Sequence, residues 1–439
     1  MTDGRKKSII KTEQMFGDDI MGLKKRVILH SDLNSFYASV ELLEFPQYRG
    51  RALAVGGNKE ERHGIILAKT PEAKEFGVNT GEPIWKALKK CPNLVVVPPN
   101  YDKYLYYSKE VQKIYYSYTN QVEPFGMDEC WLDVTGSQKL FGSGEQIANN
   151  LRKRIKEELG LTVSIGVSFN KVFSKLGSDL KKPDATTIIS RDNFKNIVWP
   201  LPCKEMIMVG PKTSIKLSKI GIYTLGQLAN SNEKIIKEIL GINGIRIRNW
   251  ANGKDDSKVS DYYYTSPIKS IGRGITTVED MTEFSDVRSV LMELCQDVSK
   301  KLIENGFLAT GISLSIRDNK LQKKRYASRL SYPTCSSIEL IRTAMNLFKG
   351  YTWNYSIRAI KIRATDLIKE NTTYQITALS DIYSHENMIN LENSIYEIRN
   401  KFGEKSVIYC NMMLKRLIPE DKRETVIMPS NYIAKSLGV

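Results

Sequence analysis

The chain has 439 residues, which is too long for one hydrophobic core and predicts two to four packed units. Lys and Arg outnumber Asp and Glu by 65 to 49, and the resulting formal charge of +16 favours a polyanionic partner such as nucleic acid, with a solubilising surface or an anionic membrane as alternatives. The sequence lacks a membrane-length apolar run, a signal peptide and any CxxC pair among its six cysteines, so we expect a cytoplasmic protein with no membrane partner, structural zinc or disulfide framework.

Residues 1–25 carry mixed charge without apolar periodicity and are expected to form a mobile leader. Residues 26–33, RVILHSDL, have the β-branched and apolar pattern of a buried strand that places a carboxylate, Asp32, near its C-terminal end. A helix is expected to follow this strand. The next segment is a small mixed insert, in which we predict strands over 51–57 and 64–70 and helices over 70–78 and 82–92.

The stretch from 100 to 189 predicts an α/β layer. Its expected helices are 104–119, 145–160 and 170–180, and its expected strands are 121–126, 130–136 and 161–168. From 190 to 253, two glycine turns each lead into a basic helix, at 208–222 and 240–253. Each resembles a helix-hairpin-helix, whose turn amides hold a DNA phosphate without reading bases.

Residues 254–266, KDDSKVSDYYYTS, are polar and aperiodic, and they are expected to form a linker that does not pack. A separate α+β unit is expected over 267–416, followed by a tail over 417–439. Its expected helices are 289–306 and 337–351, and its expected strands are 308–318 and 356–365.

The adjacent acids Asp128 and Glu129 stand in the turn between two expected strands of PFGMDECWLDV. An acidic doublet in a hairpin is, taken alone, usually a solvated turn. Neighbouring strand residues point to opposite faces, so a metal-binding pair needs a bend, which Gly126 could supply. With Asp32, the three carboxylates could hold two hard cations, as in two-metal phosphoryl-transfer sites. Asp133, four residues on, is expected to be a structural acid.

Three segments around these acids, in the same order along the chain, resemble motifs of the Y-family DNA polymerases, in particular a UmuC-like, DNA polymerase IV-like bacterial branch. They are HSDLNSFYASVE, GMDECWLDVT and SIGVSFNKVFSKLGSDLKKPD. The resemblance implies an α+β multidomain protein shaped as a right hand, whose function is low-fidelity translesion synthesis on primer–template DNA with dNTPs, in the bacterial cytoplasm and nucleoid. The hand would consist of an α/β palm (26–34 and 100–189), small fingers (35–99), a helix-hairpin-helix thumb (190–253) and an α+β little finger (267–416).

The resemblance also implies roles for individual residues. Asp32 and Asp128 would bind both of two Mg²⁺ ions, for which Mn²⁺ could substitute. The Leu33 carbonyl would assist them, and Glu129 would complete the site of the hydroxyl-activating metal. Residues implied to contact the nucleotide are Phe36, Tyr37, Lys74 and Lys182.

Tyr37 would lie under the sugar and collide with a ribose 2′-hydroxyl, although packing of both Phe36 and Tyr37 in a helix is the alternative. Lys74 would give a point-charge contact to the triphosphate, and Lys182 a second one; the alternative is that both are surface lysines. Ala68 and Pro71 depart from the family, which often has Ser or Thr and Tyr at these positions. We therefore expect a looser incoming-nucleotide site than in the DinB-like branch.

The basic stretch DNKLQKKRYASRLS would follow successive phosphates if it lay on a strand of the little finger, and otherwise it is a solvated face. The residues expected to contact DNA are Lys320, Lys323, Lys324, Arg325 and Arg329. The segment QITALSDI, beginning at Gln375, occupies the place of a sliding-clamp-binding peptide, but Ala378 and Leu379 replace its terminal Leu-Phe pair.

Two other classes of protein share parts of this pattern. A non-catalytic DNA-bridging homologue would be expected to lose one of the acids, and all three are present. A nucleotidyl cyclase can use a similar palm on free nucleotides, but the two hairpins and the basic C-terminal unit count against it.

Overall fold

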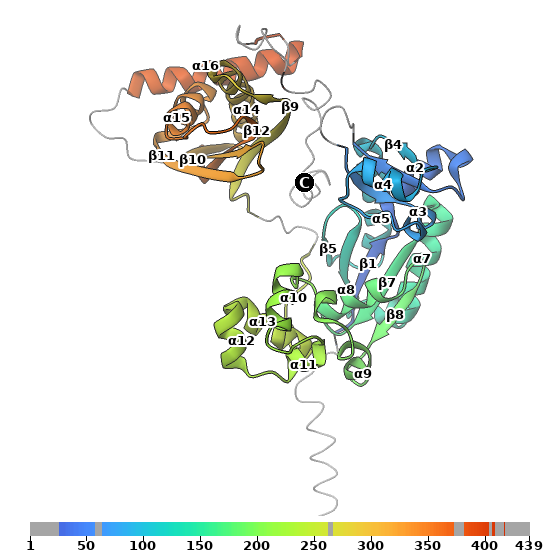
Figure 1. Ribbon diagram of the computed structural model, residues 1–439. Helices are drawn as coiled ribbons and strands as arrows, with labels where there is room; N and C mark the ends of the chain where they lie inside the picture. Colours follow the sequence, from blue (N-terminus) through green and yellow to red (C-terminus); the bar gives the residue numbers. More distant parts are fainter. Residues whose placement is uncertain are drawn as a thin grey trace, which may run out of the picture.

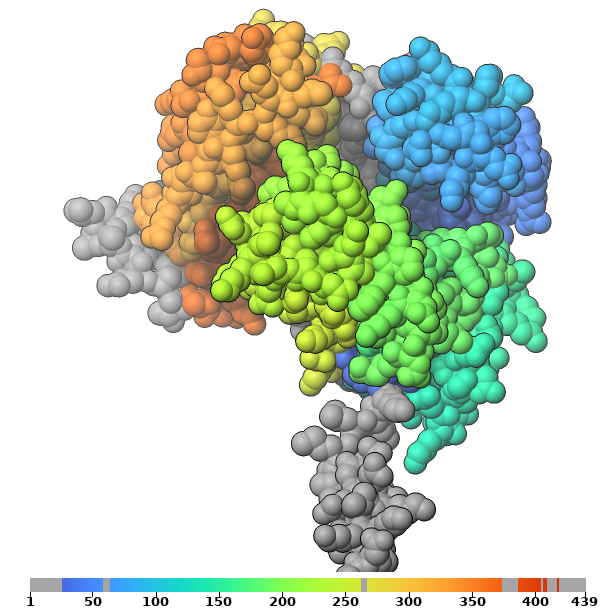
Figure 2. Space-filling model, turned by 60° about the horizontal axis from the view of Figure 1, so that its bottom comes forward, coloured from blue at the N-terminus to red at the C-terminus, as the bar shows by residue number. Residues whose placement is uncertain are grey.

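The computed structural model describes residues 26–57, 64–261, 267–372, 382–403, 406–408 and 417. Figure 1 shows an N-terminal α/β unit, a helical unit following it, and a C-terminal unit built on its own sheet. In Figure 2 the first unit runs from blue to green, the helical unit is yellow-green, and the C-terminal unit is mostly orange. The multidomain α+β prediction is confirmed. None of the helices in the described part of the chain has both the length and the apolarity that a membrane crossing requires.

The first unit is built on a five-stranded sheet of order β5-β6-β1-β7-β8, in which β1 lies antiparallel to both β6 and β7. The predicted helices and strands are present within a few residues, whereas the short last strand was not predicted. The strands are β1 (Ile28–Leu33), β5 (Val122–Pro124), β6 (Glu129–Asp133), β7 (Val163–Ser168) and β8 (Thr186–Ile189). The helices are α5 (Tyr101–Tyr116), α6 (Gln138–Phe141), α7 (Gly144–Leu159) and α8 (Lys171–Leu180).

Apolar side chains of β1, β6 and β7 pack against α5 and α7 on one face of this sheet. On the other face α8 packs directly on β1 and β7. Gly166 in β7 makes this approach possible, because a Cβ there would lie 1.9 Å from the Ser174 carbonyl oxygen and 2.6 Å from the Ser178 nitrogen. The helix therefore brings its side chains against the middle of β1.

The insert after β1 begins with α2 (Phe36–Glu44) and η1 (Pro46–Tyr48) and forms a three-stranded sheet of order β3-β2-β4. Its strands are β2 (Leu53–Gly56), β3 (Ile66–Lys69) and β4 (Val95–Val97), with helices α3 (Pro71–Glu75) and α4 (Ile84–Lys90). The helical unit contains both predicted basic helices, α10 after Gly210 and α13 after Gly241. Its elements are α9 (Phe194–Val198), η2 (Cys203–Glu205), α10 (Pro211–Ser218), α11 (Leu225–Ala229), α12 (Glu233–Leu240) and α13 (Ile242–Ala251).

The segment after α13 packs on the first unit over residues 254–260, and the prediction that it does not pack is wrong for this half. Val259 is only 3% exposed and contacts Ile28 and Trp131. The Ser260 backbone nitrogen donates to Glu123 Oε2 at 3.0 Å, and Arg26 Nη2 donates to the Ser257 carbonyl at 2.7 Å. The polar groups of the segment thus find partners distant in sequence, which composition could not reveal.

The C-terminal unit has a four-stranded antiparallel sheet of order β11-β10-β12-β9, whose apolar face is covered by two helices. The outer strands β9 and β11 and the last helix, α16, were not predicted. The elements are β9 (Ser270–Met281), α14 (Phe284–Glu304), β10 (Phe307–Asp318), β11 (Lys323–Thr334), α15 (Ser337–Lys349), β12 (Ile357–Lys369) and α16 (Ile382–Phe402).

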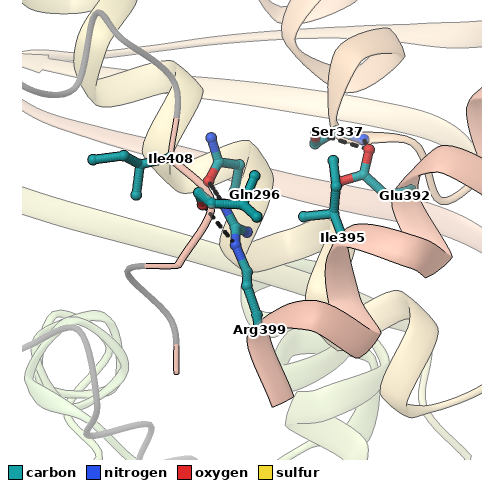
Figure 3. A pocket seen from close by; sticks show the side chains of 7 residues that line it. Gln296, Ser337, Glu392, Ile395, Arg399 and Ile408 are labelled. Atoms are coloured by element: carbon teal, nitrogen blue, oxygen red, sulfur yellow. Dashed lines mark hydrogen bonds between the residues drawn. The ribbon is translucent and has the colours of Figure 1, made fainter. Parts of the chain in front are cut away.

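Two polar contacts fasten α16 to the helices beneath it, around a small cavity (Figure 3). Arg399 Nη2 donates to Gln296 Oε1 at 2.7 Å. Glu392 Oε2 accepts from both the nitrogen and the hydroxyl of Ser337, each at 3.0 Å, at the start of α15. The helix is therefore part of the C-terminal unit.

Candidate active site

The three predicted metal-binding acids lie at one end of the five-stranded sheet, Asp32 and Glu129 on neighbouring strands and Asp128 in the turn before β6. Asp32 in β1 is paired in register with Glu129 in β6. The Leu33 nitrogen donates to the Asp128 carbonyl at 3.0 Å, which fixes the end of β1 against the turn that carries Asp128. Gly126, with φ of 89°, provides the bend before this turn. The structure thus brings together residues almost one hundred positions apart in sequence.

Burial and mutual repulsion make this group of acids electrostatically unsatisfied. Burial raises the pKa of Asp32, although Lys182 opposes the effect. Burial, together with the charges of Asp32 and Glu129, raises the pKa of Asp128 to about 6. A carboxylate with a raised pKa is one whose charge the surroundings do not stabilise. An added cation would relieve that repulsion.

Glu129 differs because two side chains from outside its strand hold its charge. Burial raises the pKa of Glu129, but the proximity of His30 and the charge of Lys175 outweigh burial and lower it to about 2. Lys175, in α8, donates to Glu129 Oε2, and His30 Nε2 lies 3.2 Å from the same oxygen. The sequence analysis missed both residues. A histidine in the middle of a buried apolar strand was the signal that could have found His30.

Lys182 contacts one of the three predicted metal-binding acids. Its Nζ donates to Asp32 Oδ2 at 2.9 Å and lies 3.0 Å from Asp179 Oδ1. The predicted triphosphate lysine is therefore adjacent to a predicted metal ligand. Lys74, by contrast, is exposed on α3 of the insert. Its charge helps to lower the pKa of Lys69, after the larger effect of burial.

The donor set suits hard divalent cations, which prefer carboxylate and carbonyl oxygens. Within the described residues, no three His, Cys, Asp or Glu side chains gather closely enough to form a metal cluster as they stand. Two ammonium groups contact the acids: Lys182 pairs with Asp32, and Lys175, in α8, pairs with Glu129. The ammonium groups of Lys175 and Lys182 thus supply positive charge to the acids, which bound divalent cations would supply instead.

A metal-free stability measurement follows from the raised pKa of Asp128. A group whose pKa is higher in the folded state contributes stability below its unfolded value, and this contribution is lost as pH rises through the folded value. In EDTA, the stability of the wild type relative to Asp128→Asn should therefore fall as pH rises from about 4 to about 6, whereas His30, whose pKa burial lowers to about 4, adds stability over this range in both proteins. Asp128→Asn should lack this loss and melt at a higher temperature at pH 7, with a gain of at most about 3 kcal/mol because the side chain is partly exposed.

Thermal melting of the two proteins across this pH range provides the measurement. Asp133→Asn is the matched control, since the Asp133 carboxylate accepts a bond from the Thr135 nitrogen at 2.9 Å. It should not raise the melting temperature. A wild type and an Asp128→Asn variant with parallel pH profiles would contradict the repulsion described above.

The two predicted aromatic contacts have different surroundings. Phe36 is 3% exposed and packs within the core of the first unit, which favours the packing alternative for it. Tyr37 is only partly buried and stacks on Tyr104, with ring centroids 4.2 Å apart and planes 8° apart. Its hydroxyl points to Met127 Sδ at 3.9 Å, next to Asp128, and burial raises its pKa to about 12. Tyr37 is thus a neutral, rigidly held ring beside the acids.

The basic stretch of the C-terminal unit does lie on a strand, but its side chains do not share one face. Lys324 belongs to the helix-covered face, because its Nζ lies 5.4 Å from the ring centroid of Tyr351 and its neighbour Tyr326 packs against the core. Lys320 lies in the preceding turn. Strand alternation places the other three predicted residues, Lys323, Arg325 and Arg329, on the open face.

Register adds basic residues that the sequence analysis did not include. Ser315 of β10 pairs with Arg325 on one side and Lys361 of β12 on the other, and two residues along, Ser313 pairs with Arg363. Paired strand residues share a face, so Lys361 and Arg363 join Arg325 on the open face. Burial, with the charges of Arg363 and Arg325, lowers the pKa of Lys361. We call Lys323, Arg325, Arg329, Lys361 and Arg363 the basic sheet face.

Gln375 lies outside the described residues, so the structure gives no geometry for the predicted clamp peptide. The leader and most of the predicted tail also lie outside them.

Two family models match the chain. The impB/mucB/samB family matches residues 31–179, and the C-terminal domain of the same family matches residues 268–378. The first match contains all three acids, and the second contains the whole basic sheet face.

Curated proteins and a solved structure are similar over most of the chain. "DNA polymerase IV" of Acetivibrio thermocellus is 44% identical over 384 residues, which are 87% of this chain and 96% of the relative. "DNA polymerase IV" of Bacillus velezensis is 36% identical over 386 residues, or 88% and 92% of the two chains. The structure titled Y-family DNA polymerase chimera Dbh-Dpo4(243-245)-Dbh matches 78% of this chain and 99% of its own, with TM-score 0.69 and 22% identity, and so bears on the fold alone.

Proposed function

The chain belongs to the impB/mucB/samB family of Y-family DNA polymerases, and from this premise we propose that Asp32, Asp128 and Glu129 hold the two divalent cations of its polymerase reaction. The protein is a DNA-directed DNA polymerase of the translesion type, and it acts on primer–template DNA and dNTPs. Members of the family depend on divalent metal ions. Mg²⁺ as the working ion, Mn²⁺ as its substitute, and action at the nucleoid in the bacterial cytoplasm are further parts of the proposal.

Two observations support this proposal most directly. Asp32 is paired in register with Glu129, and the Leu33 nitrogen donates a hydrogen bond to the Asp128 carbonyl. In the proposed site, Asp32 and Asp128 bind both ions, the Leu33 carbonyl assists, and Glu129 completes the site nearer the primer. When bound, the ions lower the pKa of the primer 3′-hydroxyl and neutralise the departing pyrophosphate. The carboxylates hold the ions in place. Lys182, whose Nζ lies 2.9 Å from Asp32 Oδ2, is placed to exchange this carboxylate for a triphosphate as its ion-pair partner.

Primer extension tests this function directly. With Mg²⁺, the purified chain should extend an annealed primer with dNTPs on an undamaged template and past a defined lesion. A DNA-bridging homologue would bind the same DNA without extending it. A nucleotidyl cyclase would consume free nucleotide without a primer. Either result would refute the proposal for the acids.

We also propose that the basic sheet face follows the duplex backbone, so that the C-terminal unit grips DNA as a little finger. Several cations on one open antiparallel face, at strand spacings, suit successive phosphates better than they suit base edges. The region beginning at Gln375 is proposed to bind the sliding clamp weakly, since Ala378 and Leu379 replace the apolar end of the motif.

Removing the little finger should weaken DNA binding and processivity while leaving the palm intact. Because residues 254–260 pack on the palm, the truncation belongs after Ser260 and not after Asp256. Every phosphate that the truncated protein no longer neutralises should reduce the slope of log affinity against log salt by about 0.9 in magnitude for duplex DNA. The measurement is primer–template affinity at several salt concentrations, and the truncated protein should show the flatter line.

Two alanine variants on one strand provide the matched comparison. Arg325→Ala removes a charge from the open face, and Lys324→Ala removes one from the helix-covered face. Only Arg325→Ala should reduce the slope. Identical slopes for the full-length and truncated chains would show that the little finger does not bind phosphates.

A further inference from the structure

A fully buried histidine lies directly behind the proposed metal ligand Glu129. His30 is in the middle of β1 and has 0% exposure. Its Nδ1 lies 2.8 Å from Ser178 Oγ in α8, and its Nε2 lies 3.2 Å from Glu129 Oε2. The ring meets Trp131 edge-on, with centroids 5.1 Å apart and an interplanar angle of 63°. Both nitrogens are thus aimed at polar groups from two other elements.

This arrangement is costly unless the imidazole does something that an apolar side chain could not do. A buried polar group without a good hydrogen bond destabilises a protein, because it loses its bonds to water without replacing them. Nε2 makes no aligned hydrogen bond to any group in the described part of the chain, although it faces the Glu129 carboxylate. A residue needed only for packing between β6 and α8 would be better as phenylalanine or leucine.

The surroundings of His30 indicate which nitrogen carries the proton. If only Nδ1 carried it, the lone pair of Nε2 would face a carboxylate at 3.2 Å. That contact would be repulsive. If Nε2 carries it, Nδ1 becomes an acceptor for the Ser178 hydroxyl, 2.8 Å away. The hydroxyl can turn to Nδ1 from the Lys175 carbonyl, to which it otherwise donates at 2.7 Å. Repulsion between that lone pair and the carboxylate therefore favours Nε2–H, which faces Glu129 Oε2 without being aligned with it.

Both contacts of Glu129 fall on the same carboxylate oxygen. His30 Nε2 faces Oε2, and the Lys175 ammonium donates to Oε2. Oε1 remains for another partner. When a cation draws the carboxylate away from Lys175, His30 is the neighbour on the rigid strand that can still hold Oε2.

We propose that His30, oriented by Ser178, is a positioning residue that holds Oε2 of Glu129 and thereby directs Oε1 toward the metal ion. The proposal rests on the proposed metal role of Glu129. Hydrogen-bonding partners behind metal ligands typically change metal affinity or activity by about 10- to 100-fold when they are replaced. His30 touches neither the substrate nor the reacting atoms.

Three substitutions at this position separate the two nitrogens. His30→Phe keeps an aromatic ring beside Trp131 but removes both polar atoms. His30→Gln places an amide nitrogen near the position of Nε2, and His30→Asn places one near that of Nδ1. We expect the Phe and Asn variants to lose about 10- to 100-fold in single-turnover rate at fixed Mg²⁺, and the Gln variant to stay within a few-fold of the wild type. Primer–template affinity should be unchanged in all three.

Mn²⁺ binding, followed by electron paramagnetic resonance on the full chain with primer–template, gives a readout that does not depend on turnover. The Mn²⁺ dissociation constant should rise in the Phe and Asn variants and recover in the Gln variant. The chain has only three histidines, so nitrogen NMR of the wild type can assign the His30 tautomer even if a variant fails to fold. We expect the proton on Nε2.

Wild-type rate and Mn²⁺ affinity in a folded His30→Phe variant would overturn the proposal, as would rescue by Asn in place of Gln, or a proton found on Nδ1 alone. Glu129→Ala separates this proposal from the metal assignment. If Glu129→Ala is inactive while His30→Phe is normal, only the positioning role fails. If Glu129→Ala extends primers normally, the metal role of Glu129 fails as well.

Discussion

Alanine at Asp32, Asp128 or Glu129 is expected to abolish primer extension while primer–template affinity stays within a few-fold of the wild type. The three carboxylates would hold the ions at which negative charge develops, whereas the proposed thumb and little finger would grip the DNA. Losing several kcal/mol of charge stabilisation corresponds to a rate loss of about a thousandfold or more. Single-turnover extension and equilibrium DNA binding, measured on the same preparations, separate the two effects.

Asp133 offers a matched control on the same strand as Glu129. Its carboxylate accepts a bond from the Thr135 nitrogen at 2.9 Å, which gives it a structural partner of its own. Asp133→Asn should therefore retain extension. Near-wild-type extension by Asp128→Ala would contradict the metal assignment, and an inactive but folded Asp133→Asn would mean that the set of essential acids is larger than three.

Tyr37→Ala is expected to admit ribonucleotides while extension with dNTPs survives. The ring of Tyr37 is fixed by stacking on Tyr104 and lies beside the turn of Asp128, so its bulk can exclude a 2′-hydroxyl without a hydrogen bond. Removing it should reduce the preference for dNTP over rNTP by on the order of 100-fold. The measurement is kcat/KM for a matched dNTP and rNTP pair.

Tyr37→Phe is the control that keeps the ring and removes the hydroxyl, whose contact in the structure is with Met127 Sδ. It should preserve the discrimination against rNTPs. If Tyr37→Ala remains folded and selects dNTPs as well as the wild type does, the ring is a packing residue and another group excludes the ribose.

The order of apolar and polar residues within single segments was enough to predict most strands and helices of the first unit. The strand around Asp32 and the hairpin around Asp128 consist of short apolar runs, so their positions follow from residues close in sequence. Cross-strand neighbours are different. The grouping of Arg325 with Lys361 and Arg363 depends on the register of β10 with β11 and β12, which no single segment encodes.

Long-range polar contacts were also beyond local pattern. His30 is 148 residues from Ser178, and their meeting depends on Gly166 allowing α8 to lie directly on the sheet. The error over the linker has the same origin. The segment was predicted not to pack because its residues are polar. Glu123, 137 residues from Ser260, accepts hydrogen bonds from the Ser260 nitrogen and hydroxyl and so allows it to pack.

The packed half of that segment also determines how far the little finger can travel. With Ser260 fixed on the palm and β9 beginning at Ser270, nine residues, 261–269, remain as the tether. Nine residues span at most about 30 Å when fully extended. A domain on so short a tether experiences its partner surface at an effective concentration in the millimolar range. The phosphate contacts proposed for the basic sheet face would then hold a duplex even if each is weak, because a contact that breaks would re-form before the DNA diffuses away.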